Sequence, residues 1–226
     1  WELVRGMVEQ RLGTGRSFWV SQPESWSLSR RHMWTLVSDA AALGECLREA
    51  RRKSTLKASS LEEATETYAN DLAAVDRAHR QFEQRLVELL DPRMEHYNAL
   101  QDVTTRLRAL YRAWADNLAR EFTALCKSRG FLPESRFQQR TLYEQVVQPY
   151  VDRGLRVALF LVDAFRYEMA TELADQLRAD GRTLDLKPRL AELPTLTVVG
   201  MNAIPPVARN GRLDVVREFG GFRAGE

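Results

Sequence analysis

Apolar side chains recur every seven residues through one long stretch of this chain. The repeat consists of Leu61, Tyr68, Val75, Phe82 and Leu89, with a second set between them: Leu72, His79 and Leu86. This spacing is typical of a helix that packs on another helix along a narrow seam, as in a coiled coil. Ser60 and Glu63 stand in the spacing of a capping box, which predicts that the helix starts just after Ser60.

A second apolar stripe follows the first. It comprises Tyr97, Leu100, Leu107, Trp114, Leu118, Phe122 and Leu125. Asp91 and Pro92 offer an N-cap and a first-turn proline for this second helix, and Gly130 offers its end. Because the turn between the two stripes is short, we expect an antiparallel helical hairpin over about residues 60–130. Residues 137–154 have the spacing of a further helix.

The hydrophobic pattern changes after residue 153. RVALFLVD, residues 156–163, is a continuous apolar run, as expected of a strand buried on both faces of a parallel sheet. Residues 166–181 have helical spacing, and residues 184–190 alternate weakly like a second strand. Since two strands do not make a stable sheet, we expect further strands from beyond residue 226. The sequence predicts an α plus α/β chain: a helical region over 1–153, then the truncated start of a parallel α/β domain over 154–226.

Composition excludes several classes of protein. Apolar residues make up 44% of the chain and charged residues 28%, as in soluble globular proteins. The formal net charge of +2 gives no general attraction to DNA or to a membrane surface. No apolar run approaches the roughly 20 residues of a membrane span. Cys46 and Cys126 lie far apart in sequence and fit a reducing compartment, so we expect a cytoplasmic protein.

Three residues of the second half could carry chemistry. Asp163 ends the apolar run, and ligands gather at the carboxyl ends of parallel strands. Its carboxylate could bind a divalent cation or simply cap the following helix. Thr197 stands where a new element begins, so its hydroxyl could approach a phosphate group or cap a helix. Alternatively, Thr197 could be an ordinary β-branched residue of a strand. Arg166 could pair with phosphate oxygens or with Glu168.

Taken together, two segments resemble a known family. LFLVDAFRYEMATELADQL and LAELPTLTVVGMNAIPP closely resemble the PglZ domain of bacterial BREX phage-defence systems. Phe165 and Ile204 replace leucines of the family pattern, both conservative changes outside the reacting groups. YANDLAAVDRAHRQF and LYEQVVQPYVDRG resemble the helical region before that domain, so the resemblance covers most of residues 60–210.

The resemblance implies a fold and a site. PglZ domains belong to the alkaline phosphatase superfamily, whose members use two metal ions and a Ser or Thr nucleophile. By this resemblance Asp163 is the first metal ligand, Thr197 rather than Thr195 is the nucleophile, and zinc or manganese is the cofactor. The superfamily takes its other ligands from Asp and His on later strands. No histidine follows Asp163, so we expect the chain to be catalytically incomplete.

Two functions follow from the resemblance. The first is part of a metal-dependent phosphodiesterase or phosphatase-like hydrolase of a BREX system, acting on a phosphoester or nucleic acid that the sequence does not identify. The second is a non-catalytic scaffold whose hairpin docks other BREX components, such as the DNA methyltransferase. DNA contact through the arginine-rich helices is a third hypothesis. His79 lies in the apolar seam, where a packed residue is favoured over a ligand or pH switch.

Overall fold

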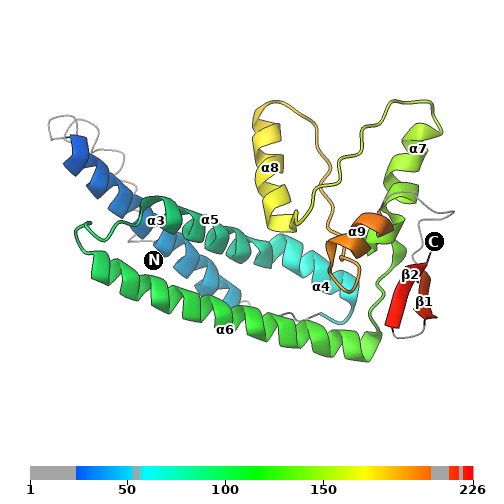
Figure 1. Ribbon diagram of the computed structural model, residues 1–226, viewed down its shortest axis with the longest axis horizontal. Helices are drawn as coiled ribbons and strands as arrows, with labels where there is room; N and C mark the ends of the chain where they lie inside the picture. The colour runs from blue at the N-terminus through cyan, green and yellow to red at the C-terminus, as the bar shows by residue number, and fades with distance from the viewer. Residues whose placement is uncertain (1–23, 53–55, 57, 205–213, 219–220, 226) are drawn as a thin grey trace. The chain divides into compact units, whose positions relative to one another are not determined.

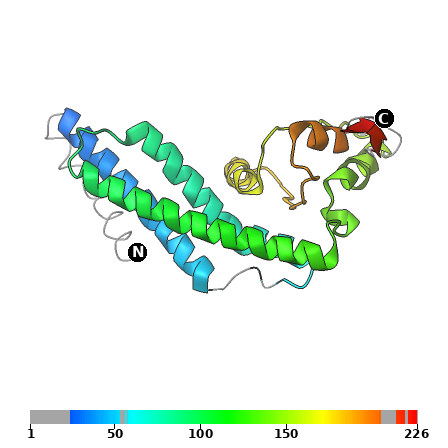
Figure 2. The same ribbon diagram turned by 60° about the horizontal axis from the view of Figure 1, so that its bottom comes forward.

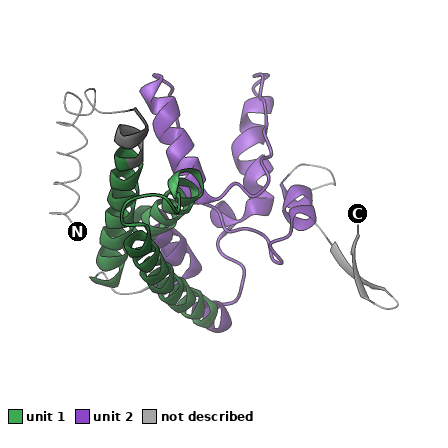
Figure 3. Ribbon diagram, turned by 60° about the vertical axis from the view of Figure 1, so that its left-hand side comes forward, with its two compact units in different colours: residues 1–57, 70–124 green, residues 58–69, 125–226 purple. Residues whose placement is uncertain are grey.

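The computed structural model describes residues 24–52, 56, 58–204, 214–218 and 221–225. The chain divides into two compact units, coloured separately in Figure 3. Unit 1 contains residues 1–57 and 70–124, and unit 2 contains residues 58–69 and 125–226. The predicted boundary between residues 153 and 154 stays a prediction. Residues 1–23 of the expected helical region and 205–213 of the expected α/β region lie outside the described residues.

Unit 1 is built from long helices. Helix α3 (Glu24–Arg52) packs along α5 (Ala73–Leu89), and most of α6 (Tyr97–Arg129) completes the unit (Figures 1 and 2). The side chains that these helices bury most completely are apolar: Leu36, Leu43, Val75, Phe82 and Leu107. An apolar face buried against neighbouring helices supplies most of the stability of such helices. Among the described residues, no helix combines the length and the apolarity that a membrane crossing requires.

Within unit 1, α5 and α6 run antiparallel, as the two apolar stripes predicted. Tyr111 Oη donates a hydrogen bond to Asp76 Oδ1 at 2.7 Å, and Arg108 forms two hydrogen bonds to Glu83, each 2.7 Å long. From Asp76 to Glu83 the sequence runs forward along α5, whereas their partners on α6 run back from Tyr111 to Arg108. The two helices are therefore antiparallel. His79 stacks on the Tyr111 ring, with ring centroids 3.6 Å apart, so it is a packed residue of this seam.

The hairpin differs from the prediction in two places. The first helix is not continuous, because α4 (Leu61–Thr67) passes through a π-helical turn (Tyr68–Leu72) before α5. The second helix starts at Tyr97 rather than near Pro92. Asp91 accepts a hydrogen bond from the Arg93 backbone N–H at 2.9 Å and therefore caps a turn instead of α6. The predicted end is confirmed, since α6 stops at Arg129 and Gly130 has a φ of 91°.

The predicted cap at Ser60 is confirmed. Ser60 Oγ accepts a hydrogen bond from the Glu63 N–H at 3.2 Å, while Glu63 Oε2 accepts one from the Ser59 N–H at 2.7 Å. We expect Ser60→Ala to lower the free energy of unfolding by about 1 kcal/mol, because an N–H of the first turn loses its partner. Urea unfolding followed by circular dichroism measures the change. Ser60→Asp keeps an acceptor and should retain most of the stability, whereas equal losses in both variants would contradict a capping role.

Unit 2 consists mainly of short helical elements and a β-hairpin. The expected helix over 137–154 is broken into turns, namely Ser135–Phe137, Gln139–Thr141, a π-helical turn over Tyr143–Val147, and α7 (Gln148–Val151). Two further helices and two antiparallel strands follow: α8 (Tyr167–Ala179), α9 (Thr197–Ala203), β1 (Asp214–Glu218) and β2 (Gly221–Gly225). The helix expected over 166–181 is thus confirmed as α8, which Gly181 follows with a φ of 77°.

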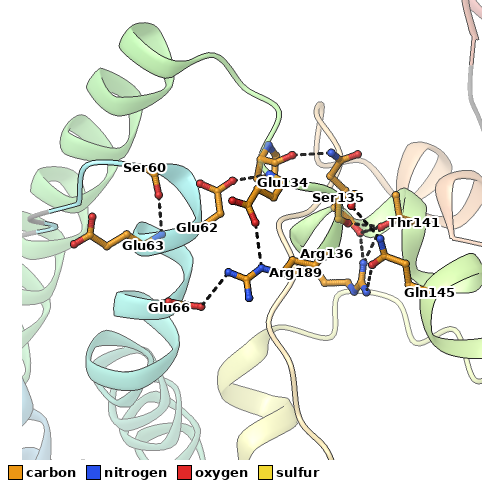
Figure 4. Close-up of polar contacts among 12 residues, drawn as sticks. Ser60, Glu62, Glu63, Glu66, Glu134, Ser135, Arg136, Thr141, Gln145 and Arg189 are labelled. Atoms are coloured by element: carbon orange, nitrogen blue, oxygen red, sulfur yellow. Dashed lines mark hydrogen bonds and ion pairs between the residues drawn. The ribbon is translucent and has the colours of Figure 1, made fainter.

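Polar contacts join α4 to the turns of unit 2 (Figure 4). Glu62 Oε1 accepts a hydrogen bond from the Glu134 N–H at 2.5 Å, and Arg136 lies 3.9 Å from Glu66. The hydrogen bond from the Glu134 backbone lowers the pKa of Glu62. These contacts tie residues 58–69 to unit 2 although the same helical stretch continues into unit 1.

The parallel sheet expected over residues 156–190 is absent from the described part of the chain. Residues 156–162 form neither helix nor strand, and Phe160 is 82% exposed. The second expected strand contributes only a single bridge, between Leu190 and Gln138. An apolar run becomes a strand only when neighbouring strands satisfy its backbone hydrogen bonds, and no described segment pairs with residues 156–162.

Candidate functional site

The side chains of Asp163 and Thr197 meet in unit 2. Thr197 Oγ1 donates a hydrogen bond to Asp163 Oδ1 at 3.1 Å across 34 residues of sequence, and the contact is exposed to solvent. Neither residue caps a helix. Leu196 is the N-cap of α9 and Arg166 is the N-cap of α8. The structure therefore brings together the two residues singled out from the sequence, and their roles as nucleophile and metal ligand stay predictions.

The backbone beside Asp163 adopts an uncommon conformation. Ala164 has a φ of 53°, in the left-handed region that residues with a Cβ seldom occupy. Such a conformation costs about 1–2 kcal/mol and persists only where surrounding contacts impose it. Conformations of this kind cluster at functional sites. The turn at Ala164 separates Asp163 from the start of α8, which explains why the carboxylate can reach Thr197 instead of capping that helix.

Arg166 pairs with Glu168, one of the two partners that the sequence suggested for it. Its Nη2 lies 2.9 Å from Glu168 Oε1, and the Glu168 side chain is fully buried whereas 60% of the Arg166 side chain is exposed. The guanidinium thus offsets the charge of a carboxylate in the first turn of α8, because a buried carboxylate needs a partner. Its role as a phosphate clamp stays a prediction.

Thr195 lies outside this contact. It is exposed, stands two residues before Thr197 in the turn that leads into α9, and makes no hydrogen bond to Asp163 among the described contacts. The structure therefore brings the hydroxyl of Thr197, and not that of Thr195, into contact with Asp163 among the described residues.

The residues that hold the Thr197 segment in place were not found from the sequence. Arg140 forms a bidentate ion pair with Glu192, with Nε 2.8 Å from Oε1 and Nη2 close to Oε2. Arg189 donates hydrogen bonds to Thr141 Oγ1 at 3.0 Å and to Gln145 Oε1 at 3.1 Å (Figure 4). Arg140 and Glu192 are 52 residues apart in sequence. No local pattern links residues at such a distance, so no sequence signal could have revealed the pair.

The Arg140–Glu192 pair makes stability depend on pH. The hydrogen bond from Arg140 lowers the pKa of Glu192 below its ordinary value of 4.5. A carboxyl whose pKa is lowered by folding contributes stability that is fully present above its pKa in the unfolded chain. This stability is lost as the pH falls through the lower pKa of the folded chain. We therefore expect Glu192→Gln to destabilise the chain at pH 7 and to differ less from the unsubstituted chain below about pH 4. Urea unfolding over this range measures the difference, and a difference independent of pH would contradict an ionised pair.

The described residues offer few candidate ligands for the predicted metal ion. Asp163 and Thr197 offer a carboxylate and a hydroxyl oxygen, donors that suit Zn²⁺ or Mn²⁺. Among the described residues, no group of three or more His, Cys, Asp and Glu is placed to hold a metal ion. The pair fits the predicted first ligand and nucleophile, but it does not make a complete coordination sphere.

The site does not coincide with the cavity in unit 1. That cavity has a volume of about 280 Å³ and is lined by residues of α3, the π-helical turn and α6, including Arg51, Leu72, Trp114 and Glu121. None of the residues predicted to act in catalysis lines it. The candidate site is instead an exposed contact at the surface of unit 2.

Comparisons with known proteins find similarity over the residues of this site. Residues 142–210 match the family described as BREX system PglZ alkaline phosphatase-like domain. The chain is 26% identical over 181 residues to an alkaline phosphatase-like protein BrxZ from Escherichia coli O9:H4 (strain HS), covering 73% of this chain and 21% of that protein. It is 29% identical over 146 residues to an alkaline phosphatase-like protein PglZ from Bacillus cereus (strain H3081.97), covering 62% of this chain and 16% of that protein. No solved structure matches.

The matched residues include the whole candidate site. Asp163, Arg166 and Thr197 all lie within residues 142–210, and so does Glu192. The match starts at residue 142, inside the region predicted to be the helical part. The chain spans about a fifth or less of the length of the two curated relatives. These matches confirm the resemblance seen in the two sequence segments.

Proposed function

We propose that this chain, a BREX PglZ domain protein, contributes the nucleophile and the first metal ligand of a metal-dependent phosphodiesterase or phosphatase-like hydrolase in anti-phage defence. The observation that supports this proposal is the 3.1 Å hydrogen bond between Thr197 and Asp163. A hydroxyl and a carboxylate that meet across 34 residues of sequence, within the PglZ match, form the minimal pair such a site requires.

Each side chain has a proposed role. Asp163 accepts the hydrogen bond of the Thr197 hydroxyl and so orients its oxygen. A zinc or manganese ion bound at Asp163 would lower the pKa of the hydroxyl and neutralise phosphate charge. Thr197 Oγ1, having lost its proton to solvent, would form a bond to phosphorus as the bond to the leaving group breaks, and the leaving group would depart into solvent and take up a proton there. Water subsequently cleaves the phosphothreonine ester and restores the hydroxyl, so the threonine is unchanged over a cycle. In this proposal the remaining metal ligands come from outside the described residues.

The test is metal-dependent hydrolysis of bis(4-nitrophenyl) phosphate. It compares this chain with a full-length PglZ protein that contains it, each with Zn²⁺, with Mn²⁺ and with a chelator. We expect turnover by the full-length protein, its loss with the chelator, and none by this chain alone, because the described donors form only part of a site. Absence of metal-dependent turnover in the full-length protein would contradict the proposal for this class of substrate.

A scaffold is the second candidate function. Helices α3 and α6 are 29 and 33 residues long, which gives unit 1 an extended helical surface suited to another protein. In this case the full-length protein would show no turnover with either metal, while unit 1 would retain other BREX components, such as the DNA methyltransferase, in a binding assay with purified partners. Turnover that depends on Thr197 would rule out a purely structural role.

A further inference from the structure

The segment that leads into Thr197 is attached to one short stretch of unit 2. The Leu190 N–H donates to the Phe137 carbonyl at 2.8 Å, and Arg189 Nη1 donates to the Gln138 carbonyl at 2.6 Å. The Glu192 N–H donates to Gln139 Oε1 at 3.2 Å. Backbone and side chains of residues 189–192 are thus held by residues 137–145 immediately before the chain reaches Pro194.

The Arg140–Glu192 ion pair is the strongest of these links. It is bidentate and charge-assisted, and such pairs are roughly twice as strong as hydrogen bonds between neutral groups. Only 11% of the Glu192 side chain is exposed, against 39% of the Arg140 side chain. Shielding from water reduces the screening of the pair, so we expect it to be stronger than a pair on an open surface.

The same stretch also contacts α9 beyond the turn. Helix α9 packs beside Gln139–Thr141, and a Cβ added to Gly200 would lie 3.8 Å from Gln139 Oε1. Gln139 therefore adjoins both the backbone of Glu192 and the helix that begins at Thr197. Gln139 and Arg140 therefore contact the chain just before the turn over residues 193–196, and Gln139 also lies beside the helix that follows it.

The contact between Thr197 and Asp163 cannot hold this turn by itself. It is one exposed hydrogen bond, and a typical hydrogen bond contributes only about 0.5–1.5 kcal/mol. The turn exposes large apolar side chains, with Leu193 and Leu196 each 60% exposed, so packing does little to fix it. The location of Thr197 must then depend on contacts on either side of the turn.

We propose that Arg140 and Glu192 are positioning residues, whose bidentate ion pair places Thr197 opposite Asp163. The structural part of this inference stands on the contacts of unit 2 alone, whereas its consequence for hydrolysis rests on the proposed function. The two parts are therefore tested separately.

Hydrogen–deuterium exchange of this chain, read by mass spectrometry, tests the structural part. We expect Glu192→Gln to increase exchange about tenfold for residues 193–203 and to change α8 much less. The double variant Arg140→Glu with Glu192→Arg should restore most of the protection, because a reversed pair can still form. Asp185→Asn is the matched control, since Asp185 pairs with Lys187 at 2.7 Å on the same segment but both are more than 70% exposed. No change in residues 193–203, or an equal increase in α8, would overturn the inference.

Kinetics of the full-length protein test the consequence. Displacing a reacting group by about 1 Å can cost roughly 100-fold in rate. We expect Glu192→Gln to lower kcat by 10- to 100-fold with little change in KM, and the reversed pair to recover at least half of the loss on a logarithmic scale. A loss of kcat that the reversed pair does not recover would overturn the positioning role. If exchange changes as expected but no variant or parent hydrolyses phosphodiesters, the proposed function fails and the structural inference stands.

Discussion

Thr197→Ala in the full-length protein is expected to lower kcat for metal-dependent phosphodiester hydrolysis by at least about 1,000-fold. The substitution removes the only oxygen on this side chain and hence the proposed site of phosphorylation. The side chain is exposed and its one described hydrogen bond goes to Asp163, so we expect little change in stability. Initial rates with bis(4-nitrophenyl) phosphate measure the effect, and thermal unfolding confirms that the variant folds.

Two further substitutions make this result specific. Thr197→Ser keeps a hydroxyl and should retain measurable activity. Thr195→Ala should leave kcat within a few-fold, because Thr195 makes no described hydrogen bond to Asp163. The opposite pattern, with activity lost in Thr195→Ala and kept in Thr197→Ala, would assign the nucleophile to the earlier threonine. Activity retained in both alanine variants would exclude a threonine nucleophile in this motif.

Phe82→Ala is expected to lower the free energy of unfolding by about 3–5 kcal/mol. Phe82 is 2% exposed and lies on α5, the helix that packs along α3. Truncating the ring removes apolar surface from the core and leaves a cavity that the helices can close only in part. Urea unfolding followed by circular dichroism at 222 nm measures the loss.

Val87→Ala is the matched control for Phe82→Ala. Val87 lies on the same helix but is 88% exposed, so its truncation should change stability by no more than about 0.5 kcal/mol. A loss below about 1 kcal/mol for Phe82→Ala would mean that unit 1 is not held together by the seam that includes Phe82. Similar losses for both variants would show that the loss does not depend on burial, since alanine has a higher helix propensity than either residue and would not itself destabilise the helix.

The helical half of the fold could be predicted because its signals are local. A seven-residue apolar repeat requires one helix face to be buried, and Ser60 and Gly130 mark helix ends through hydrogen bonds and φ angles confined to a few residues. The apolar repeat does not reveal the π-helical turn over Tyr68–Leu72, because its members before and after the turn, such as Leu61 and Val75, are buried as a continuous helix would bury them. The start of α6 was misplaced because Asp91 suits a turn as well as a helix cap.

The predicted parallel sheet depended on partners that are distant in sequence. A continuous apolar run such as residues 156–163 shows that the segment favours burial, but hydrogen bonds to neighbouring strands decide whether it is a strand. In the described residues those neighbours are absent, and Phe160 and Val162 are exposed. The same reasoning applies to residues 184–190, where only Leu190 forms a bridge.

Residue types at short spacing were enough to show the resemblance to PglZ domains, to predict long helices in unit 1 and to single out Asp163 and Thr197 as candidates. Three contacts became known only from the folded chain: Thr197 with Asp163 at 3.1 Å, Arg166 with Glu168, and Arg140 with Glu192. Local and distant contacts differ in this respect. Helix spacing and caps act within a few residues, whereas an ion pair across 52 residues forms only when the intervening chain has folded.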